Sequence, residues 1–324
     1  MKKTMLTSDR IVWLDWMKVL AIFSIIWGHF FSLAHIYLYV FSVQVFCVIS
    51  GFLYKKAPDW LTCIRKCFWQ LLVPTLILSV IMHLDAYFRS MALGTEYDIS
   101  WSWFFKWLFL GNRWCMGPCW YFYTLIVMRL IMQALPDKKW AYVLLFVMMS
   151  FGAIYFHSLG WEISNANTNV LVCMPLFLIG ILLKPLQTFC TMLHNYVVEL
   201  ALFAVASILI IWCGNYNGYV WMYLGEYGNS YTLFIIGGVA GSMLLYVISL
   251  WLSRLTYYND VVLLLSKGSI LIIGLHIIIV RRLTELPNRM WGEDLLWAVM
   301  ILIFFVPIVL LAEHFCPILL GRHQ

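Results

Sequence analysis

The chain has 324 residues, of which 64% are hydrophobic and only 11% are charged. Soluble domains average about 45–50% apolar and about 25% charged residues, and a soluble protein of this length lacks the polar surface to cover so much apolar side chain. The composition therefore excludes a soluble globular protein. It predicts an all-α, polytopic membrane protein folded as a bundle of transmembrane helices.

The charged residues and the cysteines exclude two further classes of site. The net charge of +6 comes without a basic stripe interleaved with exposed polar sequence, so nucleic acid is not an expected partner. The nine cysteines show no metal-ligand spacing, and no metal site is predicted. Cys115 and Cys119 flank Pro118 in a predicted outer loop. A disulfide there and two free thiols remain alternatives.

Apolar runs of about 20 residues, the length that crosses a bilayer, recur along the whole chain. Residues 101–110 are apolar on one face and too short to cross, so we expect them on the membrane surface, and 261–267 reads as an interfacial turn. No soluble domain or internal repeat interrupts the pattern, so residues 1–324 are predicted to form one transmembrane domain. The runs predict about ten spans, at 11–31, 36–54, 67–88, 119–135, 139–157, 168–184, 196–213, 231–252, 268–286 and 295–313.

The distribution of Lys and Arg predicts the orientation. A cytoplasmic N-terminus leaves a smaller group of basic residues outside or at the outer rim: Arg89, Lys106, Arg113, Arg281, Arg282 and Arg289. The larger group then lies inside: Lys2, Lys3, Arg10, Lys55, Lys56, Arg65, Lys66, Lys138, Lys139, Lys184, Arg254 and Arg322. The positive-inside rule therefore favours both termini in the cytoplasm. A functional role is one interpretation of the outer cluster Arg281, Arg282 and Arg289.

The first span carries three ionisable residues, Asp15, Lys18 and His29. Each costs roughly 2.5–3.5 kcal/mol on insertion scales. Lys18 and His29 are eleven residues apart, which returns to within roughly 20° of the same helix face over roughly 16 Å. Asp15 lies on the same side, one turn below Lys18. Mutual neutralisation at the inner interface remains the alternative for Asp15 and Lys18, and a packed core histidine the alternative for His29.

Further polar residues occur in later spans at a similar predicted depth. His83 and Asp85 lie in the third span, and His276 lies in the ninth, seven residues after Ser269 and on the same helix face. Three histidines from different spans predict a shared polar chamber. Lys267 is nine residues from His276 and would face the opposite side of a continuous helix, so it is not grouped with His276.

Several motifs follow one another along the chain: Arg10-Ile-Val-Trp-Leu-Asp15-Trp-Met-Lys18, Ser50-Gly51-Phe52-Leu53-Tyr54 with Arg65 and Pro74 beyond it, Cys119-Trp120-Tyr121-Phe122, Gly225-Glu226-Tyr227-Gly228-Asn229, Gly268-Ser269-Ile270 and Gly274-Leu275-His276. Their order resembles the acyltransferase-3 family of membrane acyltransferases. That family carries a basic residue, ten residues and a histidine in its first helix, which Lys18 and His29 match here. Lys18 stands where most relatives have Arg, which puts bidentate phosphate recognition there in doubt.

The resemblance implies transfer of an acyl group, usually acetyl, from cytoplasmic acyl-CoA to a hydroxyl of a cell-envelope sugar or glycan. The expected donor is acetyl-CoA, with no permanently bound cofactor. Membrane lipid is the other expected partner, the expected location is the bacterial plasma membrane, and the oligomeric state stays open. The extra soluble hydrolase-like domain of some relatives has no counterpart, so transfer is expected to finish at the membrane or with a partner.

The same resemblance suggests roles for the polar residues near the donor. His29 is the expected general base, because a neutral imidazole is the side chain best suited to accept a hydroxyl proton near pH 7. Whether His29 activates the acceptor directly or first carries the acyl group stays open. Asp15 and Lys18 are expected to orient or neutralise the donor. Arg65 and Lys66 are expected to attract the CoA phosphates, with anchoring at the membrane edge as the alternative.

The acceptor side is expected to involve His276, Ser269, His83 and Trp120, with His276 and Ser269 as candidates for oxyanion contacts. Trp120 could stack on a sugar ring, and membership of the aromatic belt is the alternative interpretation. The competing functional class is a proton-coupled transporter, in which the histidines, Asp15 and Lys18 form a proton relay. The absence of an internal repeat in the sequence argues against that class. A non-catalytic membrane sensor would leave the aligned polar face unexplained.

Overall fold

The computed structural model describes residues 11–30, 34–95, 117–159, 169–184, 195–285 and 292–322. Within these ranges all regular structure is helical, which confirms the predicted all-α helical bundle. The α-helices are α1 (Val12–Gly28), α2 (His35–Tyr39), α3 (Ser42–Phe52), α4 (Trp60–Cys67), α5 (Val73–Leu93), α8 (Trp120–Ala134), α9 (Lys139–Ser158), α10 (Asn169–Leu183), α12 (Tyr196–Asn217), α13 (Tyr231–Ser253), α14 (Asn259–Lys267), α15 (Ser269–Thr284) and α16 (Glu293–Phe315). Short helical turns complete the set, namely η1 (Phe68–Leu72), η2 (Gly117–Cys119), η3 (Met222–Leu224), η4 (Thr256–Tyr258) and η5 (Pro317–Leu320).

All ten predicted spans coincide with helices where the structure describes them, but the helices differ in length. In the described part of the chain, six stretches are long and apolar enough to cross a membrane, and the bent α14–α15 pair brings the number to seven. The six are His35–Phe52, Trp60–Leu93, Lys139–Ser158, Tyr196–Asn217, Tyr231–Ser253 and Glu293–Phe315. The other three predicted spans correspond to shorter helices, α1 with 17 residues and α8 and α10 with 15 each. The protein is a multi-pass integral membrane protein.

The two segments that were not predicted to span the membrane are 261–267 and 101–110, and the structure describes the first of them. Residues 261–267, predicted as an interfacial turn, instead belong to the nine-residue helix α14. Asp260 in its first turn and Lys267 in its last turn complement the helix dipole, which favours a helix there. The predicted surface segment 101–110 lies outside the described residues.

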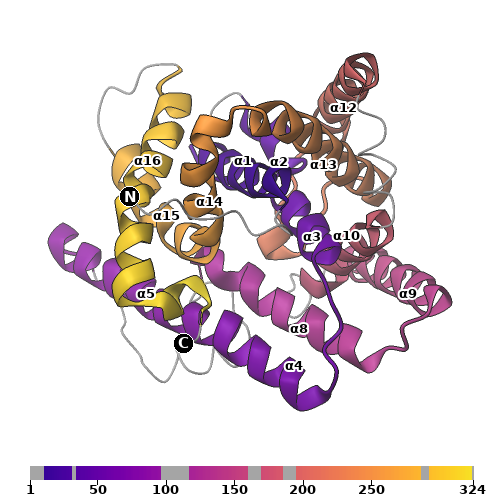
Figure 1. The fold of residues 1–324 in the computed structure, drawn as a ribbon, viewed down its shortest axis with the longest axis horizontal. Helices are drawn as coiled ribbons and strands as arrows, with labels where there is room; N and C mark the ends of the chain where they lie inside the picture. The colour runs from indigo at the N-terminus through magenta and orange to yellow at the C-terminus, as the bar shows by residue number, and fades with distance from the viewer. Residues whose placement is uncertain are drawn as a thin grey trace.

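Helix α1 occupies the middle of the bundle (Figure 1) and packs against α2, α3, α13, α14, α15 and α16. The helices α9, α12 and α16 lie at the edge of the view. Val147, Phe151, Ile208 and Ile303 are each more than half exposed on these helices. These side chains suit contact with lipid, while the polar residues of α1 are enclosed by other helices.

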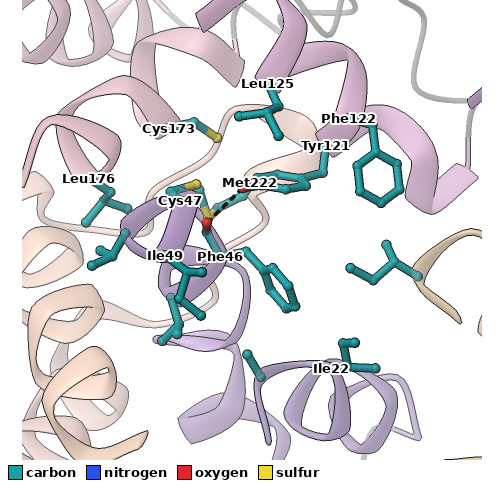
Figure 2. Close-up of a cluster of buried hydrophobic side chains, with 14 of the residues drawn as sticks. Ile22, Phe46, Cys47, Ile49, Tyr121, Phe122, Leu125, Cys173, Leu176 and Met222 are labelled. Carbon is teal, nitrogen blue, oxygen red and sulfur yellow. Dashed lines mark hydrogen bonds between the residues drawn. The ribbon is translucent and has the colours of Figure 1, made fainter. Parts of the chain in front are cut away.

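The motif Ser50-Gly51-Phe52-Leu53 lies where α3 crosses α10 at very short range. A Cβ on Gly51 would lie 1.8 Å from the Phe177 carbonyl oxygen of α10. The hydroxyls of Ser50 and Tyr121 lie 2.8 Å apart, and Tyr121 donates to the Phe46 carbonyl oxygen at 2.8 Å. Figure 2 shows this hydrogen bond among the apolar side chains that α3, α8 and α10 contribute to the core. The motif therefore fixes helix packing next to α1.

A buried carboxylate joins α12 to α13. Glu199 is 3% exposed, and its two oxygens accept hydrogen bonds from Arg254 at 2.8 and 3.1 Å and from Trp251 Nε1 at 2.7 Å. The Arg254 guanidinium also lies over the Tyr196 ring, 4.6 Å from its centroid. This carboxylate therefore holds α12 against α13.

Gly51→Ala is expected to destabilise the protein, because backbone of α10 occupies the space of the new methyl group and one helix must shift. Overpacking of this kind costs about 1–3 kcal/mol. The midpoint of thermal unfolding in detergent measures the effect. Gly152→Ala is the matched control, because its Cβ would meet the flexible tip of Leu171 at 3.1 Å. Equal midpoints for the two variants would refute a rigid α3–α10 crossing.

Candidate active site

The candidate site is built on a sharp bend between α14 and α15, whose axes differ by 81°. Gly268 stands at the bend, where a Cβ would lie 2.3 Å from a methyl carbon of Val309 on α16. The bend interrupts the helical hydrogen-bond ladder, so carbonyl groups at the end of α14 need other donors. Ser269 supplies one, because its hydroxyl donates to the Ser266 carbonyl oxygen at 2.6 Å.

One end of α1 is fixed to α14 by two side-chain hydrogen bonds. Ser266 donates its hydroxyl hydrogen to Asp15 Oδ1 at 2.6 Å. Trp16 Nε1 donates to Asn259 Oδ1 at 2.8 Å. Asp15 therefore accepts a hydrogen bond from another helix, and Lys18 lies one turn away from it on α1. Buried polar groups in a membrane need such partners, and these bonds set the position of α1 along α14.

The other end of α1 meets α15, where His29 lies against His276. The ring centroids are 5.2 Å apart and the ring planes are inclined by 35°. His276 is fully buried, and His29 follows directly after the last residue of α1. We call these two residues the histidine pair. The bent α14–α15 unit thus contacts α1 near Asp15 with one arm and at His29 with the other.

The hydrogen bonds of His276 fix its protonation pattern. Its Nδ1 lies 3.1 Å from the Ile272 carbonyl oxygen and 2.9 Å from that of Ile273. Carbonyl oxygens only accept hydrogen bonds, so Nδ1 carries the hydrogen and Nε2 of the neutral ring carries a lone pair. Among the described residues, no hydrogen-bond partner reaches this Nε2. His276 therefore presents a basic nitrogen inside the bundle.

His29 has two further neighbours. The Tyr39 hydroxyl lies 3.4 Å from His29 Nδ1, at the long end of hydrogen-bond range. The positive charge of Arg281, on α15, lies close enough to act on the imidazole. Tyr39 is on the short helix α2, which packs against α1. Tyr39 therefore places a hydroxyl beside the histidine pair, and Arg281 places a positive charge within electrostatic range of His29.

The third histidine of the predicted chamber, His83, is buried on α5, which packs along α15. Two contacts at this interface lie on either side of His83: Leu78 lies against Gly274, and Asp85 accepts a hydrogen bond from Arg282 at 2.7 Å. His83 lies between these contacts in sequence. Asp85 and Arg282 are thus bound to each other, which gives this member of the outer arginine cluster a packing role.

The remaining predicted acceptor-side residues, Ser269 and Trp120, take different positions. Ser269 is on the same helix as His276 but about 10 Å away along the axis, and its hydroxyl caps α14. Trp120 is 7% exposed and packs edge-on against Tyr121, beside η2, which contacts α5 and α15. An acceptor would reach this indole only from within the bundle. Lys267 pairs with Glu313 of α16 at 3.1 Å. The spacing argument that kept it apart from His276 assumed one continuous helix, whereas the bend at Gly268 puts Lys267 on α14 and His276 on α15.

Arg65 and Lys66, predicted to attract CoA phosphates, are exposed on α4. This helix packs mainly against α8, whereas Lys18 lies on α1 beside α14. Asp59 begins α4 by accepting a hydrogen bond from the Thr62 backbone N–H at 2.8 Å. This hydrogen bonding with Thr62, led by its hydroxyl, lowers the pKa of the Asp59 carboxyl. A stably capped helix therefore presents both basic side chains at the surface.

The contributions of Ser266 and Tyr39 were not anticipated from the sequence, whereas a functional role was one interpretation of the outer cluster that contains Arg281. Ser266 is directly before the Lys267-Gly268-Ser269 segment, but its partner Asp15 is 251 residues away. Tyr39 lies ten residues after His29 and carries no motif.

In the described part of the chain, no group of three His, Cys, Asp or Glu residues could hold a metal ion. Cys115 lies outside the described residues, so its pairing with Cys119 stays untested.

Comparison with known families identifies the family of the chain. A family model described as an acyltransferase domain, acyltransferase 3, matches residues 11–314. The chain belongs to the acyltransferase-3 family. The match spans nearly the whole chain and includes both members of the histidine pair. No curated protein and no solved structure matches the chain significantly.

Removing either member of the Asp85–Arg282 pair is expected to weaken the α5–α15 interface. Their side chains are 17% and 45% exposed, so solvent screens the pair and its coupling energy should be about 1 kcal/mol or less. A double-mutant cycle with Asp85→Asn and Arg282→Gln, read by thermal unfolding, measures it. Asp85→Asn combined with Arg254→Gln is the control, since Arg254 binds Glu199. Additive effects in the first cycle would show that the contact contributes no stability.

Proposed function

We propose that this acyltransferase-3 member is an O-acyltransferase that moves acetyl from cytoplasmic acetyl-CoA to a hydroxyl of a cell-envelope sugar. The coarser part, a membrane acyltransferase with a donor and an acceptor, follows from the family. The donor, the acyl group and the acceptor are the proposal. It also places the protein in the bacterial plasma membrane with both termini in the cytoplasm, as the distribution of Lys and Arg indicates.

The histidine pair is the observation that supports this chemistry most directly. A hydroxyl attacks a thioester carbonyl efficiently only when a base removes its proton. His29 and His276 come from helices at opposite ends of the sequence, yet their rings are 5.2 Å apart. The His276 Nδ1–H is held by backbone carbonyls, so the free lone pair is on Nε2. The two imidazoles therefore bring basic nitrogen atoms to one place in the bundle, where an acceptor hydroxyl can give up its proton.

The proposed step conserves atoms and charge. The acceptor hydroxyl gives its proton to His29 as its oxygen bonds to the thioester carbonyl carbon. The negative charge that develops on the carbonyl oxygen is stabilised by the nearby Arg281 guanidinium. The carbon–sulfur bond then breaks, and the CoA sulfur takes the proton back from the imidazolium. The products are the sugar ester and free CoA.

The donor is proposed to lie along the polar face of α1. Lys18 is separated from His29 by about 16 Å of helix. A CoA thioester has anionic phosphates at one end and its reactive carbonyl at the end of a long pantetheine arm. Lys18, oriented by Asp15, is proposed to bind a phosphate, which lets the thioester approach His29. Arg65 and Lys66 on the exposed face of α4 are proposed to attract the same polyanion, or anionic lipid, before it enters.

His29→Ala is expected to reduce acetyl transfer by about 100-fold or more, because general-base catalysis typically contributes that factor. His276→Asn should also lower the rate while leaving the KM for acetyl-CoA near the wild-type value. Transfer of radiolabel from acetyl-CoA to glycan in membrane vesicles measures both. His314→Ala, on an exposed histidine at the end of α16, is the control. Full activity of His29→Ala at equal expression would rule out His29 as the base.

Lys18→Met is expected to raise the KM for acetyl-CoA by about tenfold, which corresponds to about 1.4 kcal/mol of lost binding free energy. Lys18→Arg keeps the charge that most family members have there, so its KM should stay near that of the wild type. Lys139→Met, which removes an exposed lysine at the start of α9, is the control. The donor site at Lys18 would be refuted if Lys18→Met bound acetyl-CoA as tightly as the wild type.

A further inference from the structure

The segment between α12 and α13 carries a group of exposed aromatic rings. Tyr219, Trp221 and Tyr223 are 47%, 36% and 39% exposed. The rings of Tyr219 and Trp221 lie 5.9 Å apart with their planes inclined by 39°. We call these three residues the aromatic rim. None of them belongs to a membrane-spanning helix, so their exposure does not follow from a lipid-facing helix surface.

A sequence of contacts joins the aromatic rim to the histidine pair. The Tyr219 ring lies 5.0 Å from the ring of His35, inclined by 30°. His35 in turn contacts Tyr39, with centroids 6.0 Å apart. The Tyr39 hydroxyl lies 3.4 Å from His29 Nδ1. The exposed rings therefore lie at the His29 end of the bundle and are linked to the proposed base by two intervening side chains.

The segment that carries the aromatic rim is held in one conformation by hydrogen bonds. Asn217, at the end of α12, donates to the Tyr227 carbonyl oxygen at 2.8 Å and accepts from the Ser230 backbone N–H at 2.7 Å. Gly228 has φ +86, and a Cβ there would lie 2.5 Å from the Asn217 carbonyl oxygen. The buried Tyr227 ring also packs against His157 at 4.4 Å. The rings are thus positioned before any ligand arrives.

A buried amide lies under the same segment. Asn169 is fully buried and donates from Nδ2 to the Tyr223 carbonyl oxygen at 3.2 Å. In the described part of the chain, its Oδ1 has no hydrogen-bond partner. That oxygen lies 3.4 Å from the position of a Cβ on Gly225. This amide fixes the backbone at Tyr223 and so helps to hold the exposed rings in place.

From these contacts we infer that the aromatic rim is the acceptor-binding surface, and that its ligand is a carbohydrate. The inference rests on the proposed function. A pyranose ring presents an apolar C–H face that packs on aromatic rings and hydroxyls that need polar partners, and the rim combines both features. Binding there directs one hydroxyl of the sugar toward Tyr39 and His29. Trp221 and Tyr219 provide the stacking surface, and Tyr39 is a positioning residue for His29.

The test separates the donor and acceptor halves of the reaction. CoA release from acetyl-CoA is first measured in vesicles without acceptor. It is then measured with increasing amounts of gluco-, galacto- and N-acetylglucosamine oligosaccharides. Glycerol, which has hydroxyls but no ring face, is tested separately. Trp221→Ala should raise the KM for the oligosaccharides by about tenfold. Its acceptor-independent CoA release and its rate with glycerol should match those of the wild type.

Trp212→Ala is the matched control. Trp212 is a 43% exposed indole near the end of α12, and its ring contact is with Tyr216 rather than with the aromatic rim. It should leave the oligosaccharide KM unchanged. Equal KM values for Trp221→Ala and the wild type, or equal increases in both variants, would overturn the acceptor surface while leaving the acyltransferase assignment intact. Absence of acetyl-CoA-dependent CoA release from the wild type would refute the proposed function, and this inference with it.

Discussion

The polar face of α1 depends on its packing against a helix that bends. Inside a membrane, each buried polar group needs a partner from the protein, because neither water nor lipid can supply one. The α14–α15 unit provides Ser266 for Asp15 with one arm and His276 for His29 with the other. A straight helix could not meet α1 at both places in the same way. The 81° bend, made possible by a glycine, therefore organises the candidate site.

The histidine pair differs from the acidic residues Glu199 and Asp85 in whether an opposite charge lies against it. Glu199 and Asp85 are each bound to an arginine, so their charges are neutralised and their role is to hold helices together. His276 instead lies with Nδ1 against backbone carbonyl oxygens, which orients the ring and leaves Nε2 without a partner among the described residues. A group that is held in orientation but not neutralised by a counter-charge is suited to exchange protons.

Much of this organisation could be predicted from the sequence, because apolar runs identify helices and helical spacing groups residues on one face. The helical segments were predicted in this way, and the family was predicted from the resemblance of its motifs. The bend at Gly268 could not be, since it depends on the approach of Val309 from α16. Tyr39 and the aromatic rim carry no periodic signal, and their importance follows only from contacts with residues distant in sequence.

The unbroken helical stretch Trp60–Leu93 has a consequence for how the protein sits in its bilayer. Its 34 residues extend for about 51 Å, whereas the hydrocarbon core is about 30 Å thick. The excess length requires either a steep tilt or a projection into the headgroup layer. Trp60 and Leu61 are exposed at its beginning, close to Arg65 and Lys66. The thickness of the bilayer therefore sets the distance between these cations and the lipid phosphates. Membrane composition thereby influences how much positive charge Arg65 and Lys66 present to an approaching anion.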